Sequence, residues 1–300
     1  MTAIKSLPKP FLQLQLSTIR VAAALGVTYL IWGSTYLGAA IVLESYGPFM
    51  LTAIRLAVSI AILFLALRAR KARFPSRRLM LNAAITGALM FAGAGMVALG
   101  QDVGVTSGLA SLAVGAVPIW ATLIAFFFGQ RPGQIEVLGL AIGICGVAIL
   151  NMESGMQAQP LGALILLIGP MLWAFGTVLS SRLSLPSGFM AIFCQMIGGL
   201  LSLTMISFMR GEQFPGNPSA LSTAALIYLA VIGTLVGFSA YMYLVRTVRP
   251  ALATSYAYVN PVIAVILGAW ILAEPITGTG VLAMLAIITG VVLVMIGKSR

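Results

Sequence analysis

The sequence contains no histidine, and only six of its 300 residues are acidic. Histidines and clustered carboxylates build most acid–base and metal sites in proteins, so their scarcity argues against an enzyme, a metal centre or another cofactor. The two cysteines, Cys145 and Cys194, fall in apolar stretches and have no metal-ligand spacing. We therefore expect neither a disulfide nor a bound metal.

Charged residues of both signs are also rare, at 8% of the chain against roughly 25% in soluble domains. The chain is instead 60% hydrophobic, with a mean hydropathy of +1.08. A helix crosses the bilayer core with about 20 apolar residues. Ten such stretches can be read at 20–43, 48–67, 78–99, 104–128, 134–150, 160–181, 187–209, 219–244, 250–272 and 277–297. The sequence thus predicts an all-α integral membrane protein with short connections.

The net charge of +11 is concentrated on one side of these ten helices, which argues against nucleic acid as a partner. Counting alternate connections as one side gives that side fifteen of the 17 lysines and arginines, six of them within residues 68–78. Lysine and arginine near membrane ends mark cytoplasmic segments, so both termini are predicted to be cytoplasmic. The stretch 68–78 is interpreted as this topology signal and as a contact for anionic lipids.

Two segments of the chain, 143 residues apart, repeat one pattern. The matched pairs are Pro118 with Pro261, Ala121 with Ala264, and Pro132 with Pro275. Each half contains five of the predicted helices, an odd number, so the second half must enter the membrane in the opposite direction. We therefore predict two inverted five-helix repeats, residues 20–150 and 151–297, around a central cavity. Residues 1–19 and 298–300 would be short cytoplasmic ends.

Paired tryptophans near the start of each half, Trp32-Gly33 and Trp173-Ala174, accompany the two proline elements. Together with the helix from Pro48 to Arg55, these features resemble the EamA type of the drug/metabolite transporter superfamily. The resemblance covers about residues 20–297, and within that group the chain is similar to bacterial amino-acid exporters, including exporters of aromatic amino acids.

This resemblance implies a multi-pass transporter in the bacterial inner membrane. Its partners would be a small-molecule substrate and the lipid bilayer, with no obligate protein partner. One departure concerns the proline elements, since many relatives have an acid before the closing proline in both halves. Here Glu274 is such an acid, whereas the first half has Arg131.

Arg55 is the only basic residue inside a predicted span, about 10 Å below the outer end of its helix. Burying its charge in lipid would cost at least about 2.5–3.5 kcal/mol. Arg55 is therefore either an anchor for an anion, such as a substrate carboxylate, or a structural arginine that snorkels or bonds backbone carbonyls. Its counterpart in the second half is Gln195, which favours an inward-facing position.

Pro118 and Pro261 are expected well inside their helices, where each leaves the carbonyl four residues earlier without a helical donor. Matched kinks favour hinges that gate a cavity, and simple packing is the alternative. Pro170 is a third candidate hinge, without a counterpart in the first half. Asn260 adds a polar side chain beside Pro261 that needs a partner.

Aromatic and small polar side chains within the spans complete the candidate cavity. The candidates for its lining are Trp32, Tyr36, Ser111, Trp120, Trp173, Tyr256 and Tyr258. They are either interfacial and packing residues, or the wall of a mildly polar cavity for neutral or zwitterionic solutes with apolar side chains.

These features together predict a facilitative exporter of amino acids or similar small metabolites that works by alternating access. A multidrug exporter of lipophilic cations is the nearest alternative, but a proton-driven one would use a carboxylate in mid-membrane, and the six acids fall in loops or at helix ends. A scramblase or membrane enzyme is a more distant alternative.

Overall fold

The structure is a computed structural model that describes residues 9–129, 133–151, 160–248, 256–273 and 275–296. Within these ranges all regular secondary structure is helical, as predicted. Seven of the described segments are helical, long and apolar enough to cross a membrane. Shorter apolar helices at Gln134–Gly146, Val259–Leu272 and Gly278–Gly290 lie where further spans are expected. The chain is a multi-pass membrane protein.

The described helices overlap the predicted spans, although α1 begins at Lys9, eleven residues before the expected start. Those of the first half are α1 (Lys9–Leu43), α2 (Pro48–Ala69), α3 (Arg77–Asp102), α4 (Ser107–Val114), α5 (Val117–Phe127) and α6 (Gln134–Asn151). Those of the second half are α8 (Pro160–Arg182), α9 (Phe189–Met209), α10 (Ala220–Tyr228), η2 (Leu229–Val236), α11 (Gly237–Thr247), α13 (Tyr256–Leu272) and α14 (Gly278–Ile296). Two spans are composite, because α4 and α5 share one and α10, η2 and α11 share another.

Some parts of the sequence prediction concern residues outside the described ranges. In the repeated element these are Arg131, Pro132 and Glu274. At the two ends of the chain they are residues 1–8 and 297–300.

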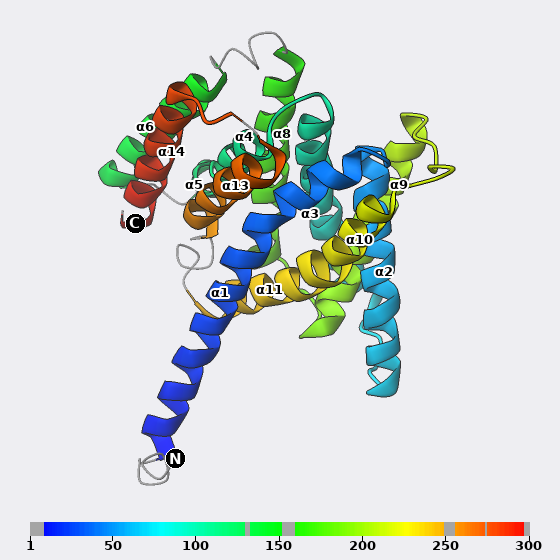
Figure 1. Ribbon diagram of the computed structural model, residues 1–300. Helices are drawn as coiled ribbons and strands as arrows, with labels where there is room; N and C mark the ends of the chain where they lie inside the picture. The colour runs from blue at the N-terminus through cyan, green and yellow to red at the C-terminus, as the bar shows by residue number, and fades with distance from the viewer. Residues whose placement is uncertain (1–8, 130–132, 152–159, 249–255, 274, 297–300) are drawn as a thin grey trace, which may run out of the picture.

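The helices of the two halves interleave instead of forming two separate bundles (Figure 1). In Figure 1 α3 lies beside α8 and α9, and α6 lies beside α14 at one edge of the molecule. Two glycines allow α3 and α9 to touch, because a Cβ on Gly87 would overlap the carbonyl of Gln195 and one on Gly198 would overlap that of Ala84. The largest apolar core spans α2, α3, α9 and α11. Both halves therefore build the same core.

The three candidate hinge prolines lie in different surroundings. Pro118 is not inside a continuous helix, because α4 ends at Val114 and Pro118 belongs to the first turn of α5. A proline there loses no hydrogen bond, since the first N–H groups of a helix have no partner within it. Pro170 and Pro261 do lie inside their helices, α8 and α13. The expected kink inside one helix is thus corrected to a two-residue interruption at Gly115 and Ala116, and α4 ends at the residue whose carbonyl the proline would have left free.

A carboxylate from the second half caps the start of α2. The N–H groups of Phe49 and Met50 donate to Glu212 at 3.3 and 2.7 Å. Ser207 Oγ donates to the same carboxylate at 2.9 Å, and only 7% of the Glu212 side chain is exposed. An acid at this place satisfies N–H groups that the helix leaves unpaired and interacts favourably with the helix dipole. The loop after α9 therefore holds the beginning of α2.

We expect Glu212→Gln to destabilise the protein by about 1 kcal/mol, because two helix N–H groups lose a charged acceptor. The measurement is the unfolding midpoint of the purified protein in detergent. Glu44→Gln is the matched control, since it removes the same charge from an exposed side chain at the end of α1. Equal midpoints for the two variants would show that the cap does not stabilise α2.

Candidate functional site

A cavity lies between helices of both halves. Its lining comes from α1, α2, α3, the α4–α5 break, α8, η2, α11 and the first residue of α13. Among the described residues, none from α6, α9, α10 or α14 lines it. The lining is mainly aromatic and aliphatic, with neutral polar side chains at Thr35, Thr52, Gln101 and Thr234. The cavity is therefore mildly polar, as the sequence suggested.

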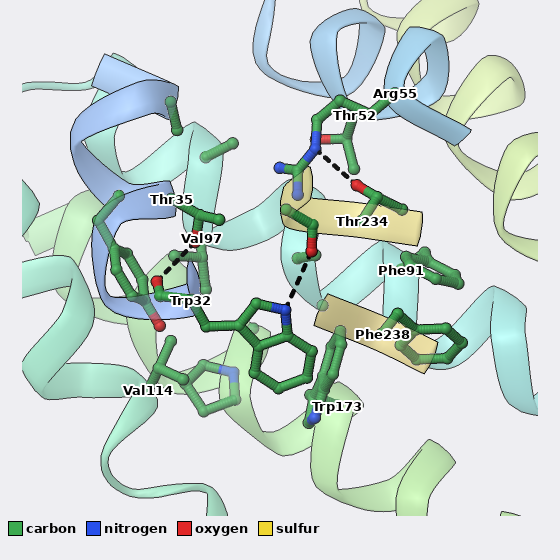
Figure 2. A pocket seen from close by; sticks show the side chains of 18 of the residues that line it. Trp32, Thr35, Thr52, Arg55, Phe91, Val97, Val114, Trp173, Thr234 and Phe238 are labelled. Atoms are coloured by element: carbon green, nitrogen blue, oxygen red, sulfur yellow. Dashed lines mark hydrogen bonds between the residues drawn. The ribbon is translucent and has the colours of Figure 1, made fainter. Parts of the chain in front are cut away.

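Arg55 is the one charged side chain among the described lining residues. It projects from α2 into the cavity, and its Nε donates to Thr234 Oγ1 at 3.1 Å (Figure 2). Its terminal nitrogens make no hydrogen bond or ion pair with any described residue. Arg55 thus bonds a hydroxyl and not backbone carbonyls. A half-buried guanidinium with free N–H groups is suited to bind an anion.

The segment that faces Arg55 is a π-helix. Besides Thr234, η2 supplies the carbonyl of Gly233, which accepts from Trp32 Nε1 at 3.1 Å, and the carbonyl of Ala230, which accepts from Ser59 Oγ at 2.7 Å. Turns of this kind are wider than those of an α-helix and frequently occur at functional sites. The π-helical segment η2 therefore positions both Arg55 and Trp32 at the cavity.

Aromatic side chains form the part of the wall away from Arg55. Trp32 packs edge to face on Trp173 and on Tyr256, with ring centroids 5.7 and 4.8 Å apart. Phe238 and Tyr241 extend this cluster, and Figure 2 shows Trp32, Trp173 and Phe238 together below Arg55. Such edge-to-face pairs stabilise one another beyond their buried area. The two tryptophans that mark the sequence repeat thus meet at the cavity.

The structure brings together part of the predicted set. Trp32, Tyr36, Arg55, Pro170, Trp173 and Tyr256 line the cavity. Ser111, Pro118, Trp120, Gln195, Asn260 and Pro261 do not line it. The side chain of Tyr258 lies outside the described part of the structure.

Gln195 and Asn260 hold helices together instead of facing the cavity. Gln195 is fully buried, and its Nε2 donates to the hydroxyls of Thr86 and Ser180 at 3.3 and 3.2 Å. The amide of Asn260, oriented to donate, reaches the carbonyls of Tyr256 and Tyr29 at 3.1 Å each. Gln195, the counterpart of Arg55 in the second half, therefore supplies no second polar group to the cavity. Close packing of α9 on α3 keeps Gln195 out of the cavity.

Sequence reasoning missed Thr52, Gln101, Thr234 and Phe238 as lining residues. Thr52 precedes Arg55 by three residues and therefore shares its helix face, a signal that could have been used. Thr234 lies in the π-helical segment η2 and Phe238 lies just after it, and neither position carries a comparable signal in the sequence. The described lining offers one guanidinium, several hydroxyls and aromatic faces, and within the described ranges no group of His, Cys, Asp and Glu could hold a metal ion.

Comparisons with known proteins find similarity over most of the chain. The EamA-like transporter family matches residues 21–152 and 160–296. The chain is 42% identical over 278 residues to the uncharacterized inner membrane transporter YedA of Escherichia coli (strain K12), which covers 92% of this chain and 90% of that protein. A probable amino-acid metabolite efflux pump of the same organism is 25% identical over 281 residues, or 89% and 92% of the two chains.

A probable terminal-alkyne amino-acid exporter of Streptantibioticus cattleyicolor is 26% identical over 248 residues, covering 81% of this chain and 82% of that protein. One solved structure superposes with a TM-score of 0.64 at 19% identity, over 91% of this chain and 95% of its own. At that identity the likeness concerns the fold alone.

Proposed function

Because the chain belongs to the EamA-like transporter family, we propose that it exports amino acids, including aromatic and apolar ones, or similar small metabolites across the bacterial inner membrane. The observation that carries this proposal is that the terminal nitrogens of Arg55 have no partner among the described residues and face a cavity with an aromatic wall. A substrate carboxylate would bind Arg55 and Thr234, and an apolar side chain would pack on Trp32 and Trp173. Two relatives named as exporters of amino acids or their metabolites support the substrate class.

The proposed architecture is ten spans in two inverted repeats, residues 20–150 and 151–297, with both termini cytoplasmic. This architecture is supported by hydrogen bonds that join loops and helix ends which the charge pattern assigns to the same side of the membrane. Glu212 bonds the start of α2 on the predicted outer side. On the predicted inner side, Arg246 donates to the carbonyl of Pro186 at 3.1 Å, and Asn82 donates to that of Ser184 at 3.0 Å.

Alternating access is the proposed mechanism, with the halves rocking about a cavity that both of them line. Pro170, Pro261 and the helix break before Pro118 are the proposed points of bending. Tyr36 and Tyr256 would contact the substrate together with the two tryptophans. Transport would be facilitative, since no carboxylate lies among the described lining residues to carry a proton.

Counterflow in proteoliposomes tests this function. Labelled phenylalanine, leucine, a nucleotide sugar and a lipophilic cation are each offered with and without a pH gradient. We expect saturable exchange of the amino acids, or of close metabolites of them, that does not depend on the gradient. Movement of the lipophilic cation alone, strictly dependent on the gradient, would overturn the proposal.

A further inference from the structure

Among the described residues that line the cavity, the charge is of one sign. Arg55 lines it, and none of the four described acids does. Glu212 caps α2, and Glu136 accepts from the N–H of Gly133 at 2.6 Å at the start of α6. Glu44 and Asp102 are exposed at the ends of α1 and α3. Each described acid therefore lies elsewhere.

This one-sided charge treats the two ends of an amino acid differently. The carboxylate meets a guanidinium whose terminal nitrogens have no partner among the described residues. Among the described lining residues, the ammonium group meets only neutral oxygens and aromatic faces. Two of these oxygens belong to Thr35 and Thr52, whose hydroxyls already donate to the carbonyls of Trp32 and Pro48. Each can therefore accept a hydrogen bond from the ammonium group but supplies no charge. Removing a charged group from water without an opposite charge to meet it costs free energy, and neutral acceptors and aromatic faces offset only part of that cost.

We propose that, within the substrate class given above, the cavity selects monocarboxylates whose amino group is acylated or absent over zwitterionic amino acids with the same side chain. This inference rests on the proposed function. The carboxylate lies at Arg55 and Thr234, and the aryl or alkyl body packs on Trp32 and Trp173. A second negative charge would find no second cation among the described lining residues, so dicarboxylates and phosphate esters are poor ligands.

The test uses five compounds that share a benzyl group and differ in the groups at the amino and carboxyl ends, and therefore in charge. They are 3-phenylpropionate and N-acetylphenylalanine as monoanions, phenylalanine as the zwitterion, phenylalaninamide as the cation and N-acetylphenylalaninamide as the neutral compound. Each competes against counterflow of labelled N-acetylphenylalanine in proteoliposomes of the full chain. Protein-free vesicles correct for diffusion through lipid. Quenching of tryptophan fluorescence in detergent gives affinities that do not depend on transport.

We expect both monoanions to bind and compete about tenfold or more better than phenylalanine. The cation and the neutral amide should compete weakly. Phenylalanine that binds and exchanges as well as the monoanions would overturn the inference and leave the proposed function intact. Failure of all five compounds and of other amino acids to exchange would overturn the proposed function instead.

A substitution in the cavity wall gives a second, independent comparison. Gln101 lines the cavity, and its Nε2 donates to the carbonyl of Tyr36 at 3.0 Å. Gln101→Glu supplies a carboxylate of almost the same shape to meet an ammonium group. The ratio of the affinities for phenylalanine and N-acetylphenylalanine should then shift toward phenylalanine by about tenfold. An unchanged ratio in a folded variant would contradict the inference.

Discussion

Arg55→Gln is expected to reduce counterflow of carboxylate solutes by about tenfold to a hundredfold. Hydrogen bonds to a charged group contribute about 1.5–3 kcal/mol, and each 1.4 kcal/mol corresponds to about tenfold in affinity. Glutamine is shorter, but its Nε2 stands where Arg55 has Nε and can still bond Thr234, whereas the charge and the terminal fork of donors are lost. Amides of the same solutes carry no charge at that end, so their exchange should change little. The measurement is the half-saturating concentration of each acid and its amide.

Two control variants make the Arg55 result specific. Arg20→Gln removes a charge from an exposed position on α1 and should leave exchange unchanged. Arg55→Lys keeps the charge without the planar fork and should fall between the wild type and Arg55→Gln. Equal losses for acids and amides in Arg55→Gln would instead mean that Arg55 supports the fold through Thr234 and η2.

Gly198→Leu should lower the free energy of unfolding by about 3 kcal/mol or more, so that little folded protein remains. The atom that a side chain at Gly198 would meet is the backbone carbonyl of Ala84 on α3. A flexible side chain could move aside, whereas a helix backbone can yield only if α3 and α9 separate. That separation would open the largest apolar core.

The measurement for Gly198→Leu is the fraction of protein that elutes as a single species in size-exclusion chromatography, together with its unfolding midpoint. Gly26→Leu is the matched control, because a Cβ at Gly26 meets nothing within 4 Å and the residue also lies inside a membrane helix. A normal elution profile for Gly198→Leu would show that α3 and α9 do not touch at this point.

Much of the fold could be predicted because the bilayer restricts the choices. Apolar stretches of about 20 residues have to be helices, since backbone groups find no other partners in lipid. The sequence repeat matched Trp32 and Trp173 as equivalent positions, and the structure adds that their side chains pack on each other. The repeat also marked the region around Pro118, although it could not distinguish a kink from the break that follows Val114.

The rest could not be predicted because it depends on contacts between distant segments. A repeat register aligns Arg55 with Gln195 along the chain but does not say which way each side chain points. Gln195 faces away from the cavity because Gly87, over 100 residues earlier, lets α3 lie against it. The π-helical turn near Thr234 is likewise surrounded by bonds from Trp32 and Arg55, and its own apolar sequence reads as ordinary helix.

The interleaving of the two halves matters while the protein is being made. Helices α1 to α6 leave the ribosome before any partner from the second half exists, so lipid must cover their contact faces in the meantime. Single membrane helices are stable in lipid during this interval, because each makes its own backbone hydrogen bonds before it associates with others. A synthesis product that stops after α6 would nevertheless lack half of its largest core, including every residue from α9 and α11. The quality control of the cell would therefore encounter a truncated chain whose contact faces, such as the one around Gly87 on α3, are uncovered. Such a chain is not half of a working transporter.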